Sequence, residues 1–123
     1  MRYLTARKRA EGKGASHTGT EHHWKMQVSA AGLAVLVPTF VFLFGSTIGG
    51  TYEEVTADLT SPFLVILTAL VLVVGMQHFA QGCKMAIEDY TQGSLRKGLI
   101  MLVFGLSYAI TATGLFALAK LAL

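Results

Sequence analysis

Three long apolar stretches alternate with short polar segments along the chain. They lie at about residues 26–49, 61–90 and 96–121, and any charged residues within them fall near their ends. An α-helix needs about 20 apolar residues to cross a hydrocarbon core of roughly 30 Å, so each stretch is long enough to span a membrane. In lipid, every backbone polar group must be paired within such a segment. The pattern therefore predicts an all-α membrane protein with three transmembrane helices.

Turn-forming residues mark where the predicted helices begin and end. The first connection, residues 50–61, is acidic and is expected to be a loop. Thr60 or Ser61 is the expected N-cap of the second helix, because Pro62 fits the first helical position. Gly93 is expected to end that helix, since glycine readily adopts the left-handed conformation of a C-terminal cap.

The segment before the first apolar stretch is polar and basic. Residues 1–24 show no helical period and are expected to form a flexible, water-exposed arm, whereas residues 25–123 are expected to form a three-helix membrane domain. The second connection is also basic, while the first contains only acidic charges. The positive-inside rule therefore predicts that the N-terminus is cytoplasmic and that the C-terminus lies on the opposite side, which is the periplasm if the membrane is a bacterial inner membrane, with the equivalent arrangement if it is the mitochondrial inner membrane. Six of the ten basic residues precede the first apolar stretch: Arg2, Arg7, Lys8, Arg9, Lys13 and Lys25.

Composition supports a membrane protein and argues against other classes. The 123 residues are 53% hydrophobic and only 14% charged, whereas about 25% of the residues of a soluble domain are charged. The formal net charge of +3 does not indicate nucleic-acid binding, because the basic residues follow the topology pattern and form no patch with aromatic residues. Cys83 is the single cysteine, which excludes an internal disulfide and a thiolate metal site within the chain.

His78 is the one ionisable side chain well inside the second apolar stretch. An imidazole at membrane depth is expensive and usually has a function. It could be an axial ligand of haem iron through Nε2, with Nδ1 held by a carbonyl group or water. It could equally be a neutral histidine that bonds to another helix. Gly75 and Gly82 lie on the same helical face, one turn to either side, which suits a porphyrin or a close helix contact.

Asp89 and Tyr90 lie near the expected water boundary of the same helix. Asp89 follows His78 by eleven residues, which is about 16 Å along the axis and nearly on the same face. A tyrosine hydroxyl can donate a hydrogen bond to a quinone carbonyl, and a neighbouring carboxylate can orient it or relay a proton. The alternative is an interfacial tyrosine beside a solvated aspartate. Lys84 and Glu88 are spaced to form an ion pair.

These features together resemble the small hydrophobic membrane-anchor subunit of succinate dehydrogenase, the D-type anchor of respiratory complex II. The resemblance covers the length, the three-span plan, the cytoplasmic arm, and the pattern of His78 followed by Asp89 and Tyr90 on the second span. The chain departs from the family pattern at one position. Gln27, just before Val28 of the first span, stands where the family often has an arginine.

The resemblance implies an anchor that holds the flavoprotein and iron–sulfur subunits on the lipid bilayer within a multi-subunit helical bundle. His78 would be one axial ligand of the iron of a haem b shared with the C-type cytochrome b anchor subunit, which supplies the other ligand. Tyr90 would hydrogen-bond a carbonyl of ubiquinone, with Asp89 supporting that site. The chain would thus contribute to electron transfer from succinate to quinone without an active site of its own.

Three alternatives stay open on the sequence alone. A fumarate reductase anchor is a close variant, because the sequence does not determine the direction of electron flow. A small transporter or channel protomer would need charges or polar residues that line a path through the spans, and no Asp, Glu, Lys or Arg accompanies His78 well inside them. A structural assembly subunit would use His78 only to bond neighbouring helices.

Overall fold

The computed structural model describes residues 5–7 and 19–123, and the second range contains three long helices and one short helix. No strand occurs among the residues described. Each long helix has the length and the apolar composition needed to cross a membrane, which confirms the predicted all-α membrane fold. In chain order the helices are α2 (Gly19–Ser46), α3 (Tyr52–Leu59, the short one), α4 (Pro62–Tyr90) and α5 (Gly93–Ala122).

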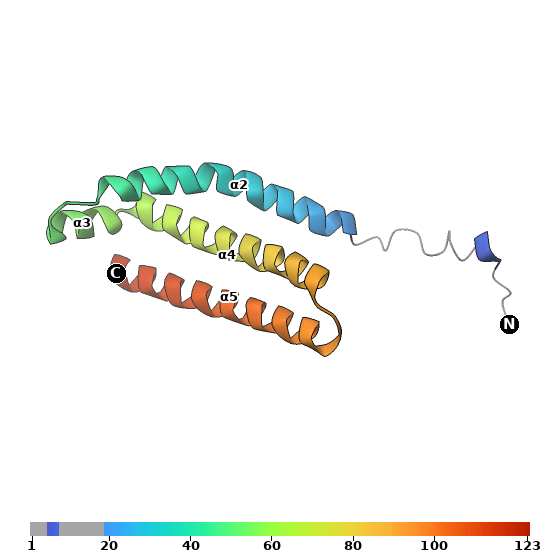
Figure 1. Ribbon diagram of the computed structural model, residues 1–123. Helices are drawn as coiled ribbons and strands as arrows, with labels where there is room; N and C mark the ends of the chain where they lie inside the picture. The colour runs from blue at the N-terminus through green and yellow to red at the C-terminus, as the bar shows by residue number, and fades with distance from the viewer. Residues whose placement is uncertain (1–4, 8–18) are drawn as a thin grey trace.

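Helix α4 is the central element of the structure. It packs against α2 on one side and against α5 on the other, so that the three long helices form one layer (Figure 1). The layer buries little: of the apolar side chains described, only Leu64, Leu67 and Ala80, all on α4, are buried. Large apolar side chains therefore cover the outside of the layer, where lipid or partner helices have to surround them.

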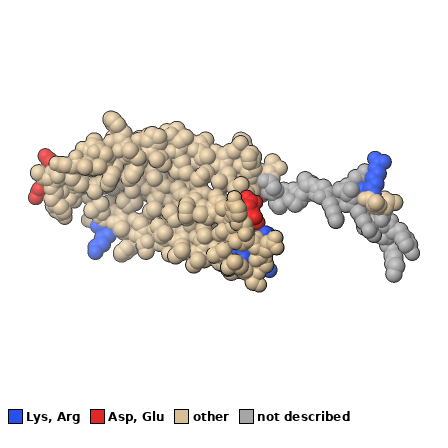
Figure 2. Space-filling view, in the orientation of Figure 1, with Lys and Arg blue, Asp and Glu red and all other residues tan. Residues whose placement is uncertain are grey.

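Charged side chains gather at the two ends of the helix layer, and an uncharged band separates them on the face shown in Figure 2. Acidic side chains gather over α3 at one end, where α5 also finishes with the basic Lys120, and both signs of charge occur near the α4–α5 connection at the other end. A hydrocarbon core requires such a band, because a charged group there is costly. The distribution of charge thus agrees with a multi-pass membrane protein.

Helix α2 begins earlier than the sequence pattern suggests. Residues 19–24, expected in the irregular arm, are helical. The spacing of Glu21 and Lys25 contributes to this, because Lys25 Nζ lies 2.6 Å from Glu21 Oε1 and such i,i+4 pairs stabilise a helix. Residues 1–4 and 8–18 of the predicted arm lie outside the described residues, so their flexibility stays a prediction.

The acidic connection was expected to be a loop, and this prediction is wrong because the connection contains α3. The Glu54 N–H donates to Thr51 Oγ1 at 3.3 Å, and the Thr51 N–H donates to Glu54 Oε2 at 2.9 Å. This reciprocal arrangement is a capping box, which satisfies two free N–H groups and stabilises the start of a helix. The pKa of the Glu54 carboxyl group is lowered, mainly because the Thr51 backbone N–H donates to it and secondly through hydrogen bonding with the Thr51 side chain.

The predicted N-cap of α4 is confirmed, and its predicted C-cap is wrong, although the helix ends at Tyr90, where the apolar stretch was expected to end. Ser61, one of the two expected N-caps, occupies that position and Pro62 follows as the first helical residue, although the Ser61 hydroxyl makes no capping bond. Thr91, and not Gly93, is the C-cap of α4. Gly93 has a φ of +63° and begins α5, because the chain reverses through the extended Thr91 and Gln92 and uses the left-handed conformation to enter the next helix.

Helices α4 and α5 approach each other closely at Gly114, where an added Cβ atom would overlap Cδ2 of Leu72. We expect Gly114→Ala to lower the free energy of unfolding of the isolated chain in detergent by about 1 kcal/mol, because Leu72 has to change its rotamer. The loss should shrink in a Leu72→Ala background. Gly105→Ala is the matched control, since an added Cβ there meets nothing within 4 Å. Equal losses for the two glycine variants would contradict this packing.

Candidate functional site

A hydrogen bond joins His78 on α4 to Ser29 on α2. The Nδ1 atom of His78 lies 2.8 Å from the Oγ atom of Ser29. Ser29 in turn donates its hydroxyl proton to the backbone carbonyl of Met26, nearly one turn earlier in α2, at 3.0 Å. Both His78 and Ser29 are half-buried, so the pair lies between the two helices. The sequence allowed for a carbonyl group or water as the Nδ1 partner, and the structure provides a serine hydroxyl.

The direction of these bonds determines where the imidazole proton lies. A serine hydroxyl has a single proton, and Ser29 uses it on the Met26 carbonyl. With that proton on the Met26 carbonyl, Ser29 Oγ accepts from His78, and this corresponds to the imidazole tautomer that is protonated at Nδ1. A neutral imidazole protonated at Nδ1 has a free lone pair on Nε2. No residue that the structure describes bonds to Nε2, so this nitrogen is available to a metal ion.

His78 and Ser29 line a groove of about 670 Å³ between α2 and α4. A volume of this size is typical of sites for cofactors and other small molecules. Gly32 contributes an open wall, since an added Cβ atom there would meet nothing within 4 Å. Lys25 is the one charged residue in the lining. The remaining lining residues are uncharged: Trp24, Val28, Leu36, Val74, Gln77 and Gln81.

The two glycines that flank His78 along α4 have different surroundings. A Cβ atom added to Gly75 would lie 3.9 Å from Cδ2 of Leu33 on α2, which is an ordinary contact distance, whereas one added to Gly82 would meet nothing within 4 Å. Neither glycine lines the groove. The open space beside the imidazole therefore comes from Gly32 on α2, and the packing of α2 on α4 would admit a Cβ atom at Gly75.

Asp89 and Tyr90 occupy the last two positions of α4. Both side chains are exposed, that of Tyr90 to 89%. In the part of the chain that the structure describes, neither side chain forms a hydrogen bond or an ion pair. Neither residue lines the groove of His78. The predicted site residues thus lie in two separate places. His78 lies beside α2, and Asp89 and Tyr90 lie at the end of α4.

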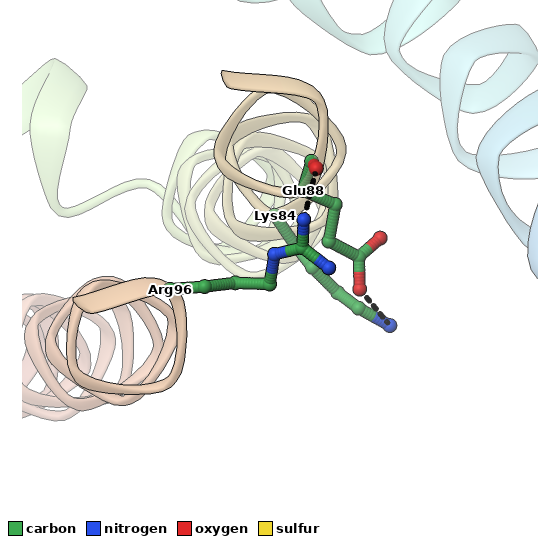
Figure 3. Close-up of polar contacts among 3 residues, drawn as sticks. All are labelled: Lys84, Glu88 and Arg96. Carbon is green, nitrogen blue, oxygen red and sulfur yellow. Dashed lines mark hydrogen bonds and ion pairs between the residues drawn. The ribbon is translucent and has the colours of Figure 1, made fainter. Parts of the chain in front are cut away.

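Polar contacts hold the end of α4 beside the start of α5 (Figure 3). Arg96 on α5 donates from Nε to the Thr91 carbonyl at 2.7 Å and from Nη2 to the Glu88 carbonyl at 2.9 Å. Lys84 Nζ lies 3.8 Å from a carboxylate oxygen of Glu88, so the predicted ion pair is confirmed. The turn that follows Asp89 and Tyr90 is therefore tied to α4 by side chains as well as by the backbone.

No group of three or more His, Cys, Asp or Glu side chains suited to a metal ion occurs in residues 5–7 and 19–123. A haem iron needs only one or two ligands from protein side chains, so a single histidine is sufficient on one side of it. His78 is the one histidine on α4 and α5. A second histidine ligand at this depth would have to come from another chain.

Ser29, Gly32 and Arg96 were not predicted as site residues. For Ser29 a usable signal exists, because a hydroxyl group within an apolar stretch needs a hydrogen-bond partner inside the membrane. Gly32 lies three residues later, on the same face of α2. The bonds of Arg96 cross a turn and depend on how α4 and α5 pack, so no spacing within one helix indicates them.

Two comparisons with known proteins find matches. A family model described as the succinate dehydrogenase/fumarate reductase transmembrane subunit matches residues 1–116. The chain is also 44% identical over 123 residues to the succinate dehydrogenase hydrophobic membrane anchor subunit of Paracoccus denitrificans, a match that covers all of this chain and 95% of that relative. No solved structure matches the chain significantly. Both matches extend over the groove and the end of α4.

The bond geometry predicts which imidazole nitrogen of His78 is protonated. In the isolated chain in lipid bilayers, nitrogen-15 NMR should show mainly the Nδ1–H form. Ser29→Ala should shift the population toward the Nε2–H form several-fold, because one hydrogen bond contributes about 1 kcal/mol. Ser29→Thr keeps the hydroxyl group and serves as the matched control. A predominant Nε2–H form in the unaltered chain would contradict the assigned bond direction.

Proposed function

This chain belongs to the succinate dehydrogenase/fumarate reductase transmembrane subunit family, and on that premise we propose how it works as an anchor. It holds the flavoprotein and iron–sulfur subunits of a succinate dehydrogenase on the membrane and contributes to a haem b site and a ubiquinone site. The observation that supports this most directly is the free Nε2 of His78 beside the groove between α2 and α4. A companion cytochrome b anchor completes both the bundle and the haem site.

The residues around His78 fit one side of a haem b site. A bound haem would supply a one-electron redox centre within the membrane. His78 would bind the haem iron through Nε2, and Ser29 would hold the imidazole in the required tautomer and orientation. Gly32 leaves room along the groove wall. Lys25 lines the groove and Gln27 does not, so Lys25, which is paired with Glu21, is the cation at this groove where the family often has an arginine.

Asp89 and Tyr90 form this chain's share of the proposed ubiquinone site at the cytoplasmic end of α4. The Tyr90 phenol is exposed and can donate its proton in a hydrogen bond to a quinone carbonyl. Reduction of a quinone to a quinol consumes two electrons and two protons. The electrons would arrive from the iron–sulfur subunit, and the Asp89 carboxylate, next to Tyr90, can orient the donor or pass protons from the water boundary.

We also propose the orientation of the chain in a bacterial inner membrane. An odd number of crossings puts the termini on opposite sides, and the basic N-terminal segment and the basic α4–α5 connection favour the cytoplasm for the N-terminus. The membrane spans at about residues 26–49, 61–90 and 96–121 and the cytoplasmic location of residues 1–24 stay predictions of the sequence. This orientation puts Asp89 and Tyr90 on the side where the soluble subunits would dock.

A structural role for His78 is the second candidate, because its bond to Ser29 already joins two helices of the chain. In that case the chain would anchor the complex without holding a haem. The transporter alternative has less support, since Lys25 is the one charged residue that lines the groove. The haem spectrum distinguishes a haem-ligand role of His78 from a structural role. If His78 only joins α2 and α4, its replacement leaves the haem spectrum of the complex unchanged.

In the assembled complex, His78→Ala should abolish or strongly alter the absorbance of the low-spin haem b, because it removes an iron ligand. Ser29→Ala should weaken haem retention by roughly tenfold or more, as loss of the group that orients a ligating histidine usually does. Gln81→Ala removes another polar group from the groove lining and should leave the spectrum in place. An unchanged spectrum in His78→Ala would exclude the ligand assignment and favour the structural role.

Tyr90→Phe removes the phenol O–H and should lower succinate–ubiquinone reductase activity roughly tenfold, the typical effect of losing a hydrogen bond that orients a substrate. Succinate oxidation with a soluble artificial acceptor should not change. Tyr52→Phe is the matched control, because Tyr52 is equally exposed but lies on α3, at the opposite end of the helices. Equal losses in the two assays for Tyr90→Phe would argue against a quinone role.

A further inference from the structure

Arg96 bridges two backbone carbonyl groups at the end of α4. From the first turn of α5 it donates to the carbonyl groups of Thr91 and Glu88, at 2.7 and 2.9 Å. Figure 3 shows its side chain extended from α5 toward the last turn of α4. The last four carbonyl groups of a helix have no partner within the helix, so the guanidinium satisfies acceptors that would otherwise need water.

The position of Arg96 makes these bonds informative. A cation in the first turn of a helix is unfavourable for that helix, whereas a cation beside the C-terminus of a helix is favourable. Arg96 lies in the first turn of α5 but bonds to the C-terminal end of α4. Its energetic benefit therefore comes from α4 and not from its own helix. Arginine suits this task because its donors form a rigid planar fork.

The residues that supply the two bonded carbonyl groups flank Asp89 and Tyr90, the residues proposed to bind quinone. Asp89 and Tyr90 lie between Glu88 and Thr91, and their own side chains form no bond among the described residues. The backbone of this turn then sets the position from which the Tyr90 side chain extends. We propose that Arg96 is a positioning residue of the quinone site, whose guanidinium holds the last turn of α4 and so fixes where the Tyr90 side chain starts relative to the helix layer. This inference rests on the proposed function of Tyr90.

Kinetics of the assembled complex test the role of the two hydrogen bonds from the Arg96 guanidinium. Arg96→Lys keeps the charge but cannot reproduce both bonds, so it should raise the KM for ubiquinone roughly tenfold, the scale of effect that follows from displacing a substrate-binding group. Haem content and activity with the soluble acceptor should not change. Lys97→Gln removes the neighbouring charge and is the matched control. A KM for Arg96→Lys equal to that of the unaltered complex, or an equal rise in Lys97→Gln, would overturn the proposal.

A second measurement follows the turn itself and does not depend on quinone chemistry. A spin label attached to Tyr90→Cys, in a Cys83→Ser background, reports the mobility of this position in the assembled complex. Adding Arg96→Gln should increase that mobility, and Lys97→Gln should not. Unchanged mobility in Arg96→Gln would overturn the proposal even if Tyr90 binds quinone. If Tyr90→Phe alone leaves quinone reduction intact, the proposed function fails, whereas the mobility result still shows whether Arg96 holds the turn.

Discussion

The hydrogen bond between His78 and Ser29 is the interaction on which the proposed haem site depends. In water such a bond contributes about 1 kcal/mol, because solvent offers a competing partner. In a membrane interior no water replaces it, so an unpaired Nδ1–H would be costly. The bond therefore holds α2 and α4 together at this depth. Since Ser29 gives its own proton to the Met26 carbonyl, the α2 backbone determines the tautomer of an imidazole on α4.

Helix α4 supports both proposed sites because a helix separates its residues by a fixed rise. His78 lies about 16 Å along the axis from Asp89 and Tyr90 at the end of α4. Loop motion does not change this distance. Each site also depends on a neighbouring helix of the same chain. Ser29 on α2 orients the histidine, and Arg96 on α5 holds the turn at the end of α4. The central place of α4 in the layer makes both contacts possible.

The sequence predicts what depends on a single helix and misses what depends on local bonds or on packing. Apolar length gives the three long helices, and the spacing of His78 and Tyr90 along α4 follows from the regular rise of that one helix. Hydropathy overlooks α3, although the Thr51 and Glu54 spacing of its capping box is visible in the sequence. The bond from His78 to Ser29 joins residues 49 positions apart, so it follows from the packing of α2 on α4 and from no pattern within either helix.

A structure of the assembled complex with its bound cofactor tests the central claim most directly. At a resolution that defines side chains, we expect His78 Nε2 at bonding distance from a haem iron, with Nδ1 still bonded to Ser29 Oγ and the second ligand on a companion anchor subunit. A haem iron held without His78, or an imidazole whose Nε2 bonds only to another protein group, would contradict the account.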